Sequence, residues 1–208
     1  MAPRLGPLRI PWPGGDASDD PYWDFFLNTP AGDPENLASE IIRRAPEGAI
    51  FPAKADLHSP EITSSHVKEL ARYLGAELVG IAGLDPEAPH PGPPSRLGGR
   101  ESRGGGLPEY PFAVVCAVRA EHDPRDAPGV GGQVPVQNGL FVTFVLSAWI
   151  RELGFRATRS EDTDAERLAA AAGLGKLNAD GRLVAPGYGT KVHVADVILT
   201  DLPLVADG

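Results

Sequence analysis

The 208-residue sequence contains a single cysteine, Cys116. One thiol excludes an intramolecular disulfide, and it excludes any metal or iron–sulfur site built from cysteines alone, since such sites take up to four thiolates. This cysteine usage favours a reducing compartment, and so the cytoplasm. Cys116 lies in a continuous apolar run from Phe112 to Val118. We therefore interpret it as a small core residue rather than a nucleophile.

Positive charge and long apolar runs are also scarce. The chain has 19 Lys and Arg against 28 Asp and Glu, which gives a formal net charge of −9. Such a balance leaves no basic surface for a phosphate backbone, so nucleic acid is not an expected partner. The N-terminus has no charged start followed by an apolar stretch, and no run of about 18 apolar residues occurs. We therefore expect neither a secretory signal nor a membrane partner, and a cytoplasmic location.

Glycine and proline are abundant instead, with 25 and 22 residues. Residues 1–34 hold eleven of them together with five of the fourteen aromatic side chains. We interpret this segment as an irregular arm whose aromatics pack on the domain, with a dimer contact or a lid as alternatives. Residues 35–208 are expected to form one domain, interrupted by Gly/Pro-rich loops at 83–108 and 124–139.

Local signals within residues 35–208 predict a mixture of helices and strands. Helices start where a capping residue precedes an amphipathic run, as in Ser59-Pro60-Glu61, and they end at glycine. Strands are short apolar or alternating runs bounded by turn residues. The expected helices cover about 33–45, 59–74, 140–153 and 164–172, and the expected strands cover 77–82, 111–119, 155–158 and 191–200.

The most informative segment is 173–189, which places five glycines around one short apolar patch. Glycines at this density supply positive φ angles, or they let backbone amides approach a flat ligand that a Cβ atom would hold away. The alternative is a helix C-cap followed by tight turns. The segment is not a dinucleotide fingerprint, because its first glycines follow a predicted helix rather than a strand, and no phosphate-binding loop is present.

Other catalytic motifs are weak. No two of the five histidines share one helical face at a spacing of four, so no metal site is predicted. His122 and Asp123 are either an acid/base pair or a solvated turn. His193 alternates with the apolar residues of its strand, so it is either a surface residue or a ligand-facing one. A Gly-x-Ser-x-Gly nucleophile elbow is missing.

Three stretches of the chain together resemble one family. Residues 66–82 are similar to the start of the cobalamin-binding domain of reductive dehalogenases, and 149–157, Trp-Ile-Arg-Glu-Leu-Gly-Phe-Arg-Ala, are similar to a second segment of that domain. The longest match is 168–204, which includes Leu-Ala-x-x-Ala-Gly-Leu-Gly and ends in Thr-Asp-Leu-Pro-Leu. Epoxyqueuosine reductases share a weaker version of these patterns.

The resemblance implies an α+β, nitroreductase-like fold, with a central, mainly antiparallel sheet covered by helices. It also implies a corrinoid lying over the glycine-rich loop, with cobalamin bound base-off and without a histidine ligand. Carried over by position, the candidate cofactor-binding residues are Gly173, Leu174, Gly175, Lys176, Leu177, Asn178 and Gly181.

The departures from the family are equally informative. Family members continue into cysteine-rich runs that hold two iron–sulfur clusters, whereas this sequence ends at Gly208 with one cysteine, so no iron–sulfur cluster is expected. The family's tyrosine proton donor has no counterpart, which leaves Tyr188 as the nearby phenol and the catalytic candidate. The basic residue of the family's glycine loop corresponds to Ala179. Self-sufficient reductive dehalogenation is therefore not expected.

Two functions remain open from the sequence. The first is a corrinoid-binding protein that binds, carries or processes cobalamin or acts as a cobalamin-dependent oxidoreductase with an external reductase. The second is a family member that has lost cobalamin and binds another small molecule or a protein in the same cavity. FMN is a less favoured cofactor, because only Lys176, Arg182 and Lys191 lie nearby as phosphate ligands. A homodimer is left open.

Overall fold

A computed structural model describes residues 39–85, 110–120, 130–161 and 163–208. The aromatic arm at 1–34, nearly all of the loop at 83–108 and the start of the loop at 124–139 lie outside the described residues, as do His122 and Asp123. The sequence-based interpretations of those segments stay predictions.

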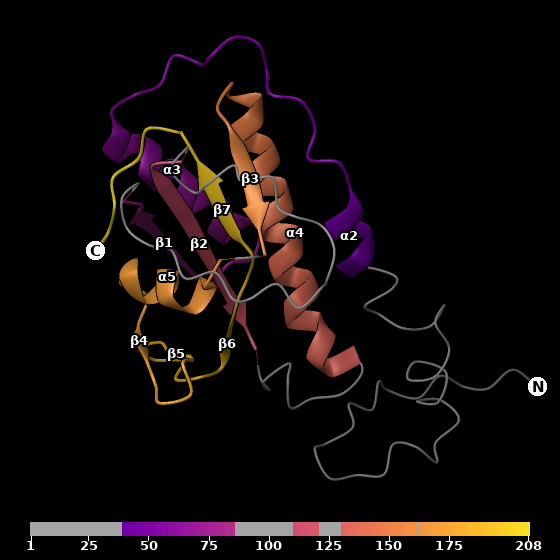
Figure 1. Ribbon diagram of the computed structural model, residues 1–208, viewed down its shortest axis with the longest axis vertical. Helices are drawn as coiled ribbons and strands as arrows, with labels where there is room; N and C mark the ends of the chain where they lie inside the picture. Colours follow the sequence, from indigo (N-terminus) through magenta and orange to yellow (C-terminus); the bar gives the residue numbers. More distant parts are fainter. Residues whose placement is uncertain (1–38, 86–109, 121–129, 162) are drawn as a thin grey trace, which may run out of the picture.

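A five-stranded antiparallel sheet forms the centre of the described chain, and its strand order is β1-β2-β7-β3 with β6 also paired to β2 (Figure 1). All six residues from Ala113 to Val118 of β2 are buried, because both faces of the sheet are covered. The strands are β1 (Leu78–Gly83), β2 (Phe112–Arg119), β3 (Ala157–Ser160), β6 (Val192–Val194) and β7 (Val197–Thr200).

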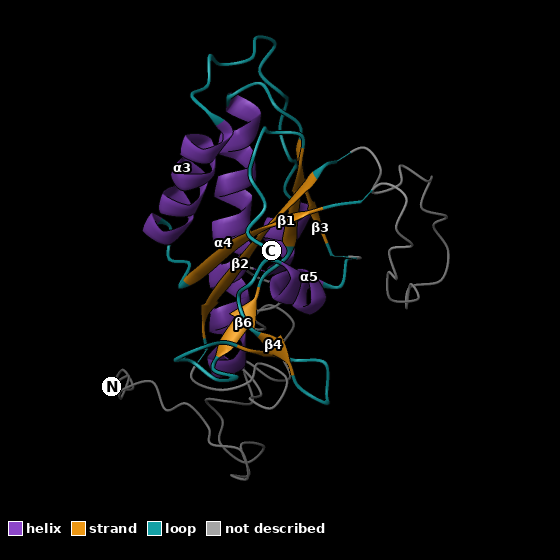
Figure 2. Cartoon of the chain, turned by 90° about the vertical axis from the view of Figure 1, so that its left-hand side faces the viewer, coloured by secondary structure: helices purple, strands orange, loops and turns teal. Residues whose placement is uncertain are grey.

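Helices cover both faces of this sheet (Figure 2). One face packs against α3 (Pro60–Tyr73) and α4 (Val130–Glu152), and the other packs against α5 (Ala165–Ala171). A small hairpin of β4 (Lys176–Leu177) and β5 (Leu183–Val184) follows α5, and the short helix α2 (Glu40–Arg44) packs against α4. The predicted fold class, a central antiparallel sheet covered by helices, is confirmed.

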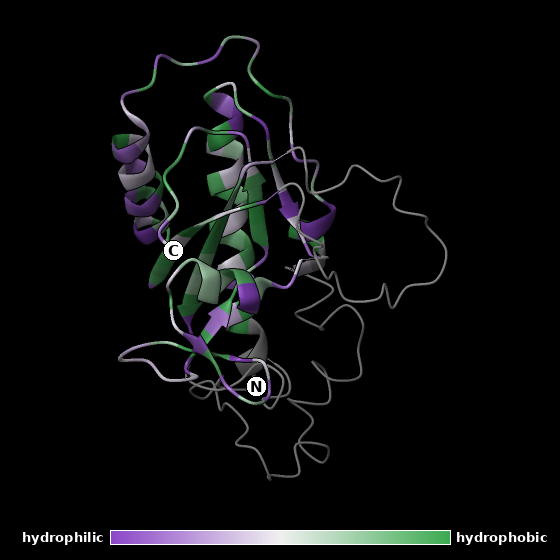
Figure 3. Ribbon diagram, turned by 60° about the vertical axis from the view of Figure 1, so that its left-hand side comes forward, coloured by the Kyte–Doolittle hydropathy of each residue, from purple (hydrophilic) through white to green (hydrophobic). Residues whose placement is uncertain are grey.

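The two faces have different cores, and the strands between them are mostly hydrophobic (Figure 3). The α3/α4 face contains large aliphatic side chains such as Ile81, Leu146 and Ile150, together with the fully buried Cys116. The α5 face consists largely of alanines and valines. A Cβ atom on Gly80 of β1 would lie 2.8 Å from the Cβ of Ala172. Small residues therefore let α5 lie close to the sheet.

Helix α4 starts ten residues earlier than the sequence pattern indicated, so 130–139 are helical and the predicted loop is wrong there. The early turns contain Pro135, which removes one backbone donor, and several glycines, which have low helix propensity. Tertiary packing outweighs these preferences, because Gly139 brings the helix so close to the sheet that an added Cβ would lie 2.8 Å from that of Ala195.

The expected strand at 191–200 is two strands, β6 and β7, which corrects a second prediction. Ala117 pairs with Val194 and Val114 pairs with Ile198, so two residues of β2 lie opposite three of the returning chain. This is a β-bulge. Without it, the odd spacing from Val194 to Val197 would turn the second strand's apolar residues away from α5.

Smaller differences concern element ends. β3 begins two residues later than predicted. Of the helix expected at 33–45, Glu40–Arg44 is α-helix, and residues 33–38 lie outside the described residues. The sequence did not predict β4 and β5 as strands. Across the described ranges, none of the helices has the length and apolar character needed to span a membrane.

Candidate functional site

The glycine segment begins with the end of α5. Asp164 caps the start of the helix by accepting a bond from the Arg167 amide at 3.2 Å. At the other end the Leu174 amide donates to the carbonyl of Ala169, and the Gly173 amide donates to that of Ala170, both at 3.0 Å. Gly173 has a φ of +74°, so these bonds form a Schellman motif. The helix-cap interpretation of Gly173 is therefore what the structure shows.

A hairpin of β4 and β5 follows, and two of the predicted site residues maintain its shape. The side-chain oxygen of Asn178 accepts bonds from the amides of Asp180 at 3.0 Å and Arg182 at 2.9 Å. A Cβ atom on Gly175 would lie 2.4 Å from the carbonyl oxygen of Val184, so no larger residue fits there. Asn178 and Gly175 are thus committed to the turn itself.

Two acidic residues from distant parts of the chain hold this segment in place. Glu166 of α5 accepts a bond from the Leu183 amide at 2.7 Å. Glu77, just before β1, accepts a bond from the Tyr188 hydroxyl at 3.0 Å. That hydrogen bond and the charge of Glu77 raise the pKa of Tyr188, so the phenol is neutral at neutral pH. In this conformation the Tyr188 hydroxyl keeps its proton and donates its hydrogen bond to Glu77.

The outer side of the segment is exposed. Lys176 is exposed, and the side chains of Leu177 and Val184 retain 37% and 39% of their accessible surface. A Cβ atom added at Gly181, Gly187 or Gly189 would meet nothing within 4 Å. Lys176 and its strand partner Val184 share one face of the hairpin, whereas Leu177 shares the other face with the buried Leu183. The outward face therefore presents Lys176 and Val184, whereas Leu174 packs against the α5-side core.

His193 lies on the opposite face of the sheet. It pairs with Val118 of β2, and its Cδ2 atom is 3.5 Å from the Cβ position of Gly139 on α4. The structure thus separates this histidine from the glycine segment by the sheet itself. Within the described ranges, no group of three His, Cys, Asp or Glu side chains is arranged to hold a metal ion.

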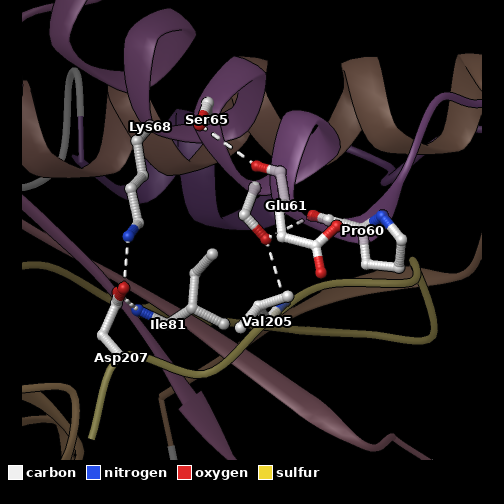
Figure 4. A network of polar contacts seen from close by, with 8 residues as sticks. Pro60, Glu61, Ser65, Lys68, Ile81, Val205 and Asp207 are labelled. Carbon is white, nitrogen blue, oxygen red and sulfur yellow. Dashed lines mark hydrogen bonds and ion pairs between the residues drawn. The ribbon is translucent and has the colours of Figure 1, made fainter.

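Two aspartates, Asp201 of the Thr-Asp-Leu-Pro-Leu motif and Asp207, hold the last residues of the described chain in place. Asp201 accepts bonds from the amide of Arg156 at 2.6 Å and from its Nε atom at 3.0 Å. Further along, Asp207 exchanges bonds with Ile81 on the free edge of β1 and pairs with Lys68 of α3 (Figure 4). The carbonyl oxygen of Asp207 lies 3.9 Å from the Cβ position of Gly173, so this tail reaches the start of the glycine segment.

Sequence reasoning did not identify Glu77, Glu166 or Asp207 as parts of the site. Glu77 and Asp207 bond residues 111 and 126 positions away, and Glu166 bonds Leu183, 17 positions away. No local pattern marks such contacts. They become visible only once the fold brings the segments together.

Neither a protein-family model nor a curated protein matches this sequence. Solved structures do match. A reductive dehalogenase described with a mechanism for B12-dependent dehalogenation is 27% identical with a TM-score of 0.63, and the catabolic reductive dehalogenase NpRdhA is 28% identical with a TM-score of 0.64. Each alignment covers 97% of this chain and 27% of the other. The chain is reductive-dehalogenase-like.

This chain thus spans about a quarter of the length of the reductive dehalogenases that it matches. Epoxyqueuosine reductase from Bacillus subtilis shows a lower similarity, with 16% identity and a TM-score of 0.46 over 70% of this chain and 47% of the other.

Proposed function

We propose that this reductive-dehalogenase-like chain binds a corrinoid on the exposed side of residues 173–189. The observation that carries the proposal is the bare backbone at Gly181, Gly187 and Gly189, in a segment whose outward face carries the exposed side chains of Lys176 and Val184. A flat macrocycle approaches backbone more closely than side chains, and its apolar edge is stabilised by contact with aliphatic groups. One of the matched reductive dehalogenases is described as B12-dependent.

The residues of the segment have separate tasks in this proposal. Gly173, Gly175 and Asn178 give the backbone its shape, and Glu166 and Tyr188 fix that shape to α5 and β1. The exposed Lys176 supplies a positive charge toward the amides and phosphate of the ligand. His193 points away, so the cobalt would receive no histidine from this strand.

When bound, the corrinoid would supply the redox chemistry of cobalt, while the protein supplies binding, orientation and exclusion of water. Burial raises the pKa of the Cys116 thiol to about 12, so this cysteine is neither a nucleophile nor an exposed redox group. We place the source of electrons in a separate reductase. Tyr188 is the candidate proton donor, and that role requires its hydroxyl to leave Glu77.

An absorbance titration of the purified protein with hydroxocobalamin and methylcobalamin tests the proposal. Saturable binding with the band shift of the base-off form is the expected result. In a parallel titration, FMN should show no saturable change in its own absorbance spectrum. No shift up to about 100 µM, which corresponds to binding weaker than about −5.5 kcal/mol, would overturn it. The favoured hypothesis would then be the alternative, in which another small molecule or a protein partner binds in the same place.

A further inference from the structure

Buried hydrogen-bond donors without acceptors gather at one junction, between α2, α4 and β3. Among the described residues, Arg151 Nη2 and the Nε and Nη1 atoms of Arg159 are buried and unpartnered, as is the hydroxyl of Ser39. Arg151, near the end of α4, is only 3% exposed. Buried polar groups in proteins nearly always have a partner, so orphaned donors concentrated in one place call for an acceptor.

The two guanidinium groups are held in place by their other atoms. Arg151 Nη1 donates to the carbonyl oxygen of Ala157 at 2.8 Å, and Arg159 Nη2 donates to that of Ile42 at 3.2 Å. The Arg159 guanidinium also lies over the Phe144 ring, 5.0 Å from its centre. Arg151 is therefore held through Nη1 and leaves Nη2 unpartnered, whereas Arg159 is held through Nη2 and leaves Nε and Nη1 unpartnered.

Nearby carboxylates do not accept these bonds. Glu47 uses Oε1 to accept from the Thr158 hydroxyl at 3.0 Å and from the Arg159 amide at 2.9 Å. Glu161 pairs with Arg43 at 3.3 Å. The charges of Glu47 and Asp196 act on Arg151 and Arg159 through space, but no ion pair within 4.0 Å joins either arginine to an acid in the described chain.

We propose that Arg151 and Arg159 form a buried binding site for a small inorganic anion at the junction of α2, α4 and β3. Guanidinium donors bond an anion about twice as strongly as neutral groups do, which favours an anion over water. The ligand must be small, because the donors are covered from solvent. This site does not depend on corrinoid binding, since it lies on the α4 side of the sheet and the glycine segment lies on the α5 side.

Thermal unfolding of the whole chain in chloride, phosphate or gluconate at constant ionic strength tests the site, with Arg159→Met and Arg72→Met as the variants. Arg72 is an exposed arginine of α3 and serves as the matched control. At concentrations above the Kd, each tenfold rise in the concentration of an anion that binds adds about 1.4 kcal/mol to the free energy of unfolding. For a chain of this size, that raises Tm by about 3 to 6 °C. Gluconate is too large to enter and should give no such rise.

We expect the rise for phosphate or chloride in the wild type and in Arg72→Met, and its loss in Arg159→Met. A response to chloride alone identifies a halide-sized site, and a response to phosphate identifies an oxyanion site. An equal rise in all three proteins, or none in the wild type, overturns the proposal and leaves water as the acceptor. Should Arg159→Met not fold, line broadening of chloride or phosphate nuclear resonance signals by the wild-type protein, absent with unfolded protein, decides the same question.

Discussion

Replacing Gly80 by alanine tests the close approach of α5 to the sheet, on which the position of the glycine segment depends. The added Cβ atom would lie 2.8 Å from both the Cβ and the carbonyl oxygen of Ala172, and 2.9 Å from a methyl carbon of Leu174. Ala172 and Leu174 flank the Schellman glycine. Two of the three close atoms belong to a helix end that cannot rotate away, so α5 and the following turn must shift.

Overpacking of this kind costs about 1 to 3 kcal/mol, which lowers Tm by about 2 to 12 °C in a domain of this size. The matched control is Gly83→Ala in the same strand, where the added Cβ meets only the Cβ of Ala206 at 3.6 Å. Urea unfolding and thermal unfolding of both variants measure the difference. If Gly80→Ala were as stable as Gly83→Ala and the wild type, the packing of α5 on β1 would be refuted.

Three further predictions concern single side chains. Burial and repulsion from Glu161 raise the pKa of Asp196, so its ionisation destabilises the native state as pH rises through that pKa, and Asp196→Asn should raise Tm at pH 7. This gain should vanish below about pH 4, where the carboxyl is protonated in both states, and a lower Tm at pH 7 would contradict it. Asp201→Ala removes two bonds to Arg156 and should cost about 1.5 to 3 kcal/mol in urea unfolding; a change below about 0.5 kcal/mol would show that they contribute little. Cys116 is fully buried, and burial raises its pKa to about 12, so a thiol reagent should label it only at the rate of unfolding; rapid labelling of the native protein would contradict its place in the core.

Elements with strong local signals were predictable from the sequence. Ser59 and Pro60 occupy the cap and first position of α3, as their order indicated, and the Ser59 hydroxyl accepts from the Ile62 amide at 3.4 Å. The buried strands β1 and β2 also lie within a residue or two of the predicted runs. In each case the residues that determine the structure are neighbours in the chain.

Features that depend on distant contacts were not predictable in this way. The early start of α4 depends on packing of Gly139 against Ala195, which outweighs the low helix propensity of its first turns. The bulge after β6 does have a local signal, the odd spacing between Val194 and Val197. Only pairing with β2 shows why both valines still face α5.

The candidate site shows the same division. The glycine content alone located the segment at 173–189, and its resemblance to reductive dehalogenases selected seven residues within it. The sequence did not separate residues that shape the backbone, such as Gly175 and Asn178, from those with exposed side chains, such as Lys176 and Leu177. That distinction requires the pairing of β4 with β5 and their contact with α5.

The same distinction decides how the proposed binding surface is best probed. A larger residue at Gly175 would collide with the Val184 carbonyl, so loss of binding in such a variant would not separate a ligand contact from a distorted hairpin. Val184 is 39% exposed and shares the outward face with Lys176, so glutamate there adds charge and a polar group to the proposed surface with little effect on packing. Val205→Glu is the matched control, because Val205 is similarly exposed at 41% and lies beside α3.

The measurement that tests the central claim most directly is the hydroxocobalamin titration of the wild type, Val184→Glu and Val205→Glu, after urea unfolding has shown that the three have similar stability. We predict base-off binding to the wild type and to Val205→Glu with the same Kd, and a Kd at least about tenfold weaker for Val184→Glu, equivalent to about 1.4 kcal/mol. Equal affinity in all three proteins, or no binding by the wild type, would contradict a corrinoid site at residues 173–189.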